Sequence, residues 1–282
     1  MLARVNSQRL LARCRTCVEA VRVVRVIKPV CPQRCAEPRW QDFLALSSRS
    51  VTKSAMATPS PEEGILDVCD RLSRLSTGPF PPVAPKAAAV LVPLFEDESG
   101  IVRVLLTQRS PNLSTHQGEV CLPGGKKDPG DADDVHCALR EAQEELGLNP
   151  QSVQIIAQLP PFLSKHKLSV TPVIGRLMTI DALTPNASEV NAVFDMPLAA
   201  FLEDVPSHTY KDAHWQGIQY RLHYFQYNNF LVWGLTAAML IQVAQHAFAR
   251  PTGFLELTPG SRPYHQLFFN GERLLWQDPQ KT

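Results

Sequence analysis

Gly124-Gly125-Lys126, followed after a loop by Arg140-Glu141-Ala142-Gln143-Glu144-Glu145-Leu146-Gly147, is the stretch that decides the fold of this 282-residue chain. It places a Gly-Gly pair ahead of a segment whose carboxylates recur at helical spacing. Glycine lets a backbone approach a ligand closely, and hard divalent cations prefer carboxylate oxygens. A Gly-Gly turn beside a carboxylate helix therefore predicts a site that holds a divalent metal against a diphosphate.

Residues from about 132 to 146 are predicted to form one amphipathic helix. Asp131 is the expected N-cap, with Asp134 three residues later in an acidic version of a capping box. Gly147 is the expected stop at the C-terminal end, and Pro150 follows it. The apolar residues recur at three- and four-residue intervals and form one face, made of Val135, Ala138, Leu139, Ala142 and Leu146.

The carboxylates of Glu141, Glu144 and Glu145 are expected to project together on a flank of that apolar face. Like charges at this spacing destabilise a helix by a few tenths of a kcal/mol. A bound Mg²⁺ or Mn²⁺ would offset the repulsion, and the backbone carbonyl of Gly125 would complete its shell of ligands. A solvated acidic face is the alternative, and the triplet alone leaves both readings open.

The segment resembles the Nudix box, whose pattern is Gly, five residues, Glu, seven residues, Arg-Glu, a bulky aliphatic, any residue, Glu-Glu, any residue, Gly, aliphatic. Two features depart from the pattern: Ala142 replaces a larger aliphatic, and the loop between Gly125 and Arg140 is one residue longer, with no Glu in its middle. Asp131, Ala132 and Asp133 stand there instead. The matching residues are Arg140-Glu141, Glu144-Glu145, Gly147 and Leu148.

The segment before the box resembles the signature of the coenzyme A diphosphatase branch of that family, which also has the longer loop. Ser114 stands where the signature has Arg, and Leu122 where it has Phe. The resemblance implies hydrolysis of the diphosphate bond of coenzyme A and its thioesters, giving 3′,5′-ADP and (acyl-)4′-phosphopantetheine. The residues that carry it are Leu105-Leu106-Thr107-Gln108-Arg109-Ser110 and His116-Gln117-Gly118-Glu119-Val120-Cys121-Leu122-Pro123-Gly124-Gly125.

The resemblance implies that Glu141, Glu144 and Glu145 bind Mg²⁺ or Mn²⁺, with Gly125 offering a backbone oxygen. It also implies that a carboxylate accepts the proton of the attacking water. In related enzymes this base is either the Glu that follows Arg140, which is Glu141 here, or a Glu from a later loop. Glu189 is the candidate for that later Glu, and an ordinary acid in a surface loop is its equal alternative.

Three basic residues are candidates for binding the substrate. Arg109 and Lys126 are expected to contact phosphate oxygens, and the guanidinium fork of Arg109 suits such oxygens well. A solvated charge is the alternative for each residue. Arg140 is the third candidate, although its favoured role is to orient the acids from within the helix.

Two other functions stay open. A broader nucleoside diphosphate hydrolase, acting on ADP-ribose, NADH or dinucleotides, is favoured by Ser114, which replaces a basic residue of the signature. A catalytically silent Nudix domain that senses a nucleotide is the other. It is disfavoured because a silent domain gains nothing from a charge cluster that destabilises its own helix. In every case the partner is a small molecule and not a nucleic acid, and no oligomeric state is predicted.

The first 55 residues have the composition of an organellar transit peptide. They hold nine Arg and two Lys against three acids, a net charge of +8, whereas the rest of the chain carries −7. The density of Arg favours a mitochondrion, with a plastid as the alternative; a basic tail that binds nucleic acid or anionic membrane is a further reading. Met56 is a speculative second start that would give a cytosolic form. No apolar stretch is long enough for a membrane span.

The remaining chain predicts an α/β protein in which a mixed β-sheet lies between α-helices, the architecture that the Nudix resemblance implies. We expect a linker with a short helix at 56–84, the Nudix domain at 85–250, and a tail at 251–282 that packs on the domain because it is rich in aromatic residues. The expected strands are 87–95, 102–106, 153–159, 169–178 and 220–225, with a helical turn at 197–202 and a long helix at 231–249. Cys69, Cys121 and Cys137 are expected to be reduced thiols. Cys14, Cys17, Cys31 and Cys35 have a spacing compatible with zinc, but no knuckle residues surround them.

Overall fold

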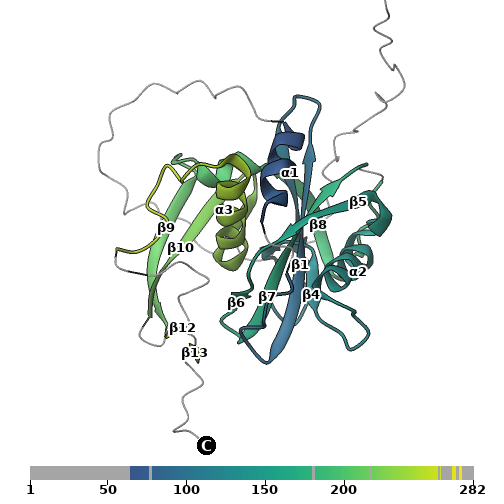
Figure 1. Cartoon of the computed structure of the whole chain (residues 1–282), viewed down its shortest axis with the longest axis horizontal. Coiled ribbons are helices and arrows are strands. Elements are labelled where there is room, and N and C mark those ends of the chain that lie inside the picture. Colours follow the sequence, from purple (N-terminus) through teal and green to yellow (C-terminus); the bar gives the residue numbers. More distant parts are fainter. Residues whose placement is uncertain are drawn as a thin grey trace, which may run out of the picture.

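A computed structural model describes residues 64–75, 78–179, 182–215, 218–259, 261, 269–270 and 273–274 (Figure 1). The predicted transit peptide at 1–55, the second start at Met56 and the cysteine pairs before residue 36 lie outside the described residues, as does most of the tail from 262 onward.

The main sheet has eight strands and a central order β3-β2-β1-β7-β5, with β4 on β1, β6 on β7 and β8 on β2. Its centre is the parallel pair β1 and β7, aligned from Lys86 opposite Leu168 to Leu94 opposite Arg176. All other pairings are antiparallel, so the sheet is mixed, as predicted. The strands are β1 (Lys86–Glu96), β2 (Val102–Arg109), β3 (Val120–Cys121), β4 (Gly124–Lys126), β5 (Val153–Gln158), β6 (Phe162–Leu163), β7 (Leu168–Leu177) and β8 (Val190–Pro197).

Helices cover both faces of this sheet (Figure 1). On one face, Ala89 and Leu91 of β1 form a core with α2 (Asp134–Leu146). On the other face, Ala88 and Val92 belong to a core with α1 (Ile65–Ser73) and α3 (Gly234–Phe248). Successive residues of a strand point to opposite faces, so β1 is apolar at nearly every position instead of alternating. The predicted sandwich is confirmed.

A second, three-stranded antiparallel sheet has the order β11-β10-β9. Several elements differ from expectation. The long helix begins at Gly234 and not at residue 231, because Trp233 pairs with Tyr224 in the sheet and Gly234 then turns the chain at φ 63°. The long strands β8 and β9 were not predicted, and neither were the short strands β3, β4, β6 and β11. The elements are β9 (His208–Trp215), β10 (Ile218–Tyr227) and β11 (Phe230–Trp233), with η3 (Pro150–Ser152), η4 (Leu198–Leu202), β12 (Phe269–Asn270) and β13 (Arg273–Leu274) elsewhere.

Residues 251–259, which follow α3, lie against β9 and β10. The Phe254 ring lies tilted against that of His208, with 3.9 Å between the ring centroids, and Arg221 donates to the carbonyl of Leu255 at 3.0 Å. The His223 ring forms a hydrogen bond with the carbonyl of Glu256 at 2.7 Å.

Cys69, Cys121 and Cys137 are free thiols, as expected. No helix within the described part of the chain is long and apolar enough to cross a membrane.

Candidate active site

The two glycines of β4 allow the sheet and α2 to meet. Gly124 pairs with Val90 of β1 and Gly125 pairs with Ala89. Gly124 has a φ of 154°, and a Cβ there would overlap the carbonyl oxygen of Ala89; a Cβ on Gly125 would overlap the carboxylate of Glu141. Only glycine fits at position 124, where the overlap is with backbone, and a side chain at position 125 would displace the Glu141 carboxylate. The Gly-Gly pair therefore lets the carboxylates of α2 reach the strand.

The boundaries of α2 correct one prediction and confirm another. The N-cap is Asp133, whose side chain accepts from the amide of His136 at 2.7 Å; the expected cap, Asp131, lies outside the helix and serves another purpose. Asp134 pairs with Lys127 at 3.1 Å and does not form a capping box. Gly147 ends the helix in the left-handed conformation at φ 66°, as predicted.

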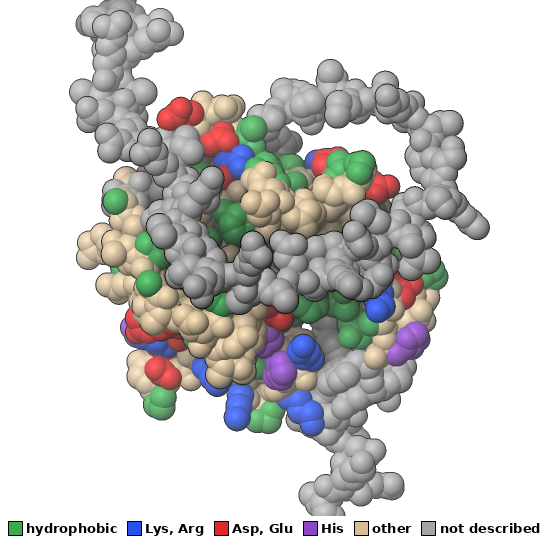
Figure 2. Space-filling model, turned by 180° about the vertical axis from the view of Figure 1, so that it is seen from behind, with side chains coloured by type: hydrophobic (Ala, Val, Ile, Leu, Met, Phe, Trp, Pro, Cys, Tyr) green, Lys and Arg blue, Asp and Glu red, His purple; other side chains and the backbone are tan. Residues whose placement is uncertain are grey.

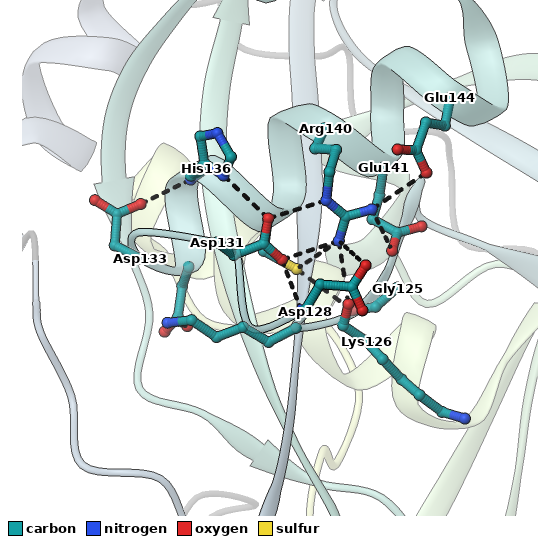
Figure 3. A network of polar contacts seen from close by, with 12 residues as sticks. Gly125, Lys126, Asp128, Asp131, Asp133, His136, Arg140, Glu141 and Glu144 are labelled. Carbon is teal, nitrogen blue, oxygen red and sulfur yellow. Dashed lines mark hydrogen bonds and ion pairs between the residues drawn. The ribbon is translucent and has the colours of Figure 1, made fainter.

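Asp131 is buried against Arg140 (Figure 3). The Arg140 Nε donates to one carboxylate oxygen and Nη2 to the other, each at 2.9 Å. The Asp128 amide donates at 2.8 Å, and the His136 ring lies at 3.0 Å. These contacts, with Arg140 foremost, hold the pKa of the Asp131 carboxyl well below its usual range. A bidentate pair between an Arg guanidinium and a carboxylate is among the strongest ion-pair geometries in proteins.

Asp131 is the residue of this site that sequence reasoning missed. It was assigned to helix capping because it precedes the apolar periodicity of α2. A signal was available: Asp131 is the sixth residue after Gly125, which is where the Nudix pattern has its Glu. The extra residue of the loop falls after this acid, between Asp131 and Arg140, so the spacing to the glycine is kept and the salt bridge still forms.

Arg140 also holds two acids of the helix. Its Nη1 lies 3.1 Å from Glu141 Oε1 and 3.2 Å from Glu144 Oε2, while Nη2 donates to the carbonyl of Lys126 at 3.2 Å. Figure 3 shows the guanidinium between Asp131 on one side and Glu141 and Glu144 on the other, with the Lys126 ammonium pointing away. The donors of Arg140 are thus engaged within the protein, which favours orientation of the acids over contact with a substrate.

Glu145 is the most buried acid of the helix and is 3% exposed. The expectation that all three acids lie on a flank of the apolar face and not in the core is therefore wrong for this residue. Its Oε2 accepts from the amide of Gly124 at 3.3 Å. Burial raises the pKa of Glu145 to about 7; the Gly124 bond and nearby Arg109 oppose the rise, and Glu141 and Glu189 add to it. The charged form of such a buried carboxyl group carries a desolvation cost, and a bound cation would offset that cost.

Tertiary contacts bring Glu189 to this cluster from a distant loop. The amide of Ser110 donates to the carbonyl of Glu189 at 2.7 Å, and the amide of Asn186 donates to the carbonyl of Glu145 at 2.9 Å. The loop is therefore attached both to the end of β2 and to the end of α2. The pKa of Glu141 is raised, chiefly by its burial and further by Glu144 and Glu189. Glu141, Glu145 and Glu189 thus share one electrostatic environment.

Arg109 supplies a positive charge at the same place. It is the last residue of β2, and its charge lowers the pKa of Glu145. Its Nε is buried and has no hydrogen-bond acceptor among the described residues. A buried donor without a partner costs free energy unless a ligand or water satisfies it. Cys121 lies beside it, and burial raises the pKa of that thiol to about 11, so Cys121 is neutral and not a nucleophile.

The donor set fits a hard divalent cation, since it consists of carboxylates and a carbonyl. Glu141 packs directly over Gly125, and Glu145 bonds to Gly124. The carbonyl of Gly125 accepts a long contact of 3.7 Å from the Cys137 thiol. Within the described residues, no three Asp, Glu, His or Cys side chains already converge as metal ligands.

Comparison with known proteins gives consistent matches. The family model described as NUDIX domain matches residues 85–214. Over 181 residues, the chain is 49% identical to Nudix hydrolase 15, mitochondrial, and 47% identical over 181 residues to Nudix hydrolase 22, chloroplastic, both from Arabidopsis thaliana. These matches cover 62% of this chain and 63% and 60% of the relatives, so the chain spans less than two thirds of either. It is 40% identical over 185 residues to peroxisomal coenzyme A diphosphatase NUDT7 of Mus musculus, covering 63% of this chain and 74% of that protein.

Proposed function

Because this chain belongs to the Nudix hydrolase family, we propose that it hydrolyses the diphosphate bond of coenzyme A and its thioesters. The products are 3′,5′-ADP and (acyl-)4′-phosphopantetheine. The observation that carries the proposal is the buried Nε of Arg109, which has no acceptor among the described residues and lies near Glu145, an acid that also interacts with Glu189. An unsatisfied cationic donor next to clustered acids suits a metal-bound anion, and Arg109 belongs to the signature Leu105–Ser110 that resembles coenzyme A diphosphatases. The 40% identity to a protein of that name supports the same choice.

Mg²⁺ or Mn²⁺ is the proposed cofactor, held by Glu141, Glu144 and Glu145 with the carbonyl of Gly125. When bound, such an ion neutralises charge on phosphoryl oxygens and lowers the pKa of a bound water. The residues of the chain provide the rest. Arg140 keeps Glu141 in place from one side while Gly125 leaves space for its carboxylate on the other.

The proton of the attacking water is accepted in this proposal by Glu141 or Glu189. Removing a general base costs about 10²–10⁴ in rate. If Glu189 is the base, Glu189→Gln loses turnover by such a factor while the Mn²⁺ concentration at half-maximal activity stays as in the wild type. Glu141→Gln then shifts that concentration upward, because it removes a metal ligand. A Glu189→Gln enzyme with wild-type turnover would assign the base to Glu141.

The test of the proposed reaction uses the full chain with coenzyme A, ADP-ribose and NADH, each with Mg²⁺ and with Mn²⁺. Chromatography of the products should show 3′,5′-ADP from coenzyme A and little product from the other two. Addition of a chelator should stop the reaction and serves as the control. An enzyme that releases no 3′,5′-ADP under any of these conditions would refute the proposal.

A broader nucleoside diphosphate hydrolase is the second candidate. Ser114 favours it, because this exposed residue brings no charge where the coenzyme A signature has Arg. Comparable rates on ADP-ribose or NADH in the same assay would support this candidate over the first.

We also propose that residues 1–55 direct the protein to an organelle, with a mitochondrion favoured over a plastid by their Arg content. The names of the two plant relatives, one mitochondrial and one chloroplastic, support an organellar address. A fluorescent fusion of the full chain should be organellar, and removal of residues 1–55 should disperse it; an unchanged distribution would contradict the proposal.

A further inference from the structure

Basic side chains gather at one end of the main sheet, next to the candidate active site. We call Lys126, Lys165, Lys167, His116 and His166 the basic rim; all five are exposed. Lys, Arg and His side chains collect along the lower edge of the face in Figure 2. The rim forms because β4 ends, β7 begins and the β6–β7 turn lies at the same end of the sheet.

Two separate loops meet in the basic rim. The ring of His116, in the loop after β2, packs edge-on against the ring of His166, in the β6–β7 turn, at 5.3 Å. Lys126 lies on β4, two strand spacings or about 10 Å from β7. The rim is tied to the active site on both sides: Lys126 follows Gly125 in the chain, and the Arg109 amide donates to the Glu119 carbonyl of the His116 loop at 2.9 Å.

The backbone is strained at two positions of the rim. His116 has a φ of 55° and Lys167 a φ of 57°, two of the four non-glycine residues with positive φ among those described. This left-handed conformation is costly for residues that carry a Cβ and nearly free for glycine. Charged or ionisable side chains therefore occupy two turn positions where glycine would be more stable. Such strain concentrates at functional sites.

The positive charge of the rim is mostly uncompensated. In the described residues, no carboxylate lies within ion-pair distance of Lys126, Lys165 or Lys167. His116 does have a partner, since its Nδ1 lies 2.6 Å from Glu119 Oε2. Neighbouring Lys127 is engaged by Asp134 and is not part of the rim. Lysines gathered without acids repel one another, and a phosphate would offset that repulsion.

We infer that the basic rim binds a phosphomonoester of the substrate that is separate from the diphosphate under attack. This inference rests on the proposed function: coenzyme A carries such a group on the 3′ oxygen of its ribose, whereas ADP-ribose and NADH do not. Ser114, in the His116 loop, lacks the positive charge of the Arg that the signature has at this position, and the lysines of the β6–β7 turn supply positive charge instead. The rim makes the enzyme selective for coenzyme A over 3′-dephospho-coenzyme A.

The test compares kcat/KM for coenzyme A and for 3′-dephospho-coenzyme A in the full chain. Wild-type enzyme should prefer coenzyme A, and Lys165→Ala/Lys167→Gly should lose about tenfold of that preference, the size of one charge-assisted contact. Its kcat/KM for the dephospho substrate should stay unchanged. Because glycine relieves the strain at residue 167, its melting temperature should not fall. Lys211→Ala, an exposed lysine of β9, is the control and should change neither value.

Each outcome decides one of the two proposals. Equal preference in the variant and wild type, or no preference in the wild type, overturns the role of the rim and leaves the proposed function standing. A wild-type enzyme that hydrolyses neither substrate overturns the proposed function instead. Calorimetry with 3′,5′-ADP and AMP then decides the rim by itself: tighter binding of 3′,5′-ADP that is lost in the variant supports it, and equal affinities overturn it.

Discussion

Glu145→Gln is expected to lower turnover by about 10²–10³ while raising the stability of the metal-free protein at alkaline pH. The loss of rate follows from removing a proposed metal ligand, since metal stabilisation of transition-state charge is worth several kcal/mol and each 1.4 kcal/mol is tenfold. The gain in stability has a separate cause. Among the described residues, Glu145 is buried with only the Gly124 amide as hydrogen-bond donor, so its charged form is poorly solvated.

The pH dependence of this effect follows from the raised pKa of Glu145. The pKa of Glu145 rises from 4.5 to about 7 on folding. Between these values the unfolded chain loses the proton and the folded protein keeps it, so stability falls as pH rises. Above pH 7 the full cost is present and amounts to about 3 kcal/mol. Glutamine carries no such cost, and the variant should therefore gain most above pH 7 and little near pH 4.

Thermal unfolding with a chelator from pH 5 to pH 9 measures the gain, and repeating it with Mn²⁺ measures metal binding. Mn²⁺ should raise the melting temperature of the wild type and have much less effect on Glu145→Gln. Glu144→Gln is the matched control, because Glu144 is exposed and its removal should leave metal-free stability nearly unchanged. Wild-type turnover together with an unchanged melting temperature at pH 8 would contradict both roles assigned to Glu145.

Asp131→Asn is expected to destabilise the protein by about 2–4 kcal/mol and to lower activity without touching a proposed metal ligand. Removing one partner of a buried ion pair is costly because the other charge stays desolvated; the lower end of that range applies because the Arg140 side chain is 22% exposed. Activity should fall because Arg140, once released, no longer fixes Glu141 and Glu144.

Urea unfolding at pH 7 gives the stability change, and kcat on coenzyme A gives the effect on the site. Asp134→Asn is the control: it is an equal change of acid to amide close by, and it breaks only the pair with Lys127, whose side chain is 31% exposed. A loss below about 1 kcal/mol is expected there. Equal destabilisation by the two substitutions would mean that the Asp131–Arg140 pair contributes no more to the free energy of unfolding than the Asp134–Lys127 pair.

Local sequence patterns were sufficient to predict those elements whose structure is decided by short-range interactions. The three- and four-residue spacing of apolar side chains predicted α2, and Gly147 predicted its end, because helical hydrogen bonds join residues four apart. The family assignment made from Arg140–Leu148 is confirmed for the same reason: the motif is nearly contiguous. The helix α2 begins two residues later than predicted, because Asp131 forms a buried ion pair with Arg140 and does not cap the helix.

The amino-acid sequence by itself therefore determined the mixed α/β sandwich, the glycine turn and the order of acids on α2. Only the tertiary structure decided that Glu145 is buried, that Asp131 binds Arg140, and that Glu189 and Arg109 join the same cluster. The physical reason is distance along the chain. Glu189 reaches Ser110 through a backbone hydrogen bond at the edge of two paired strands, and such a register depends on the packing of the whole sheet and not on any local pattern.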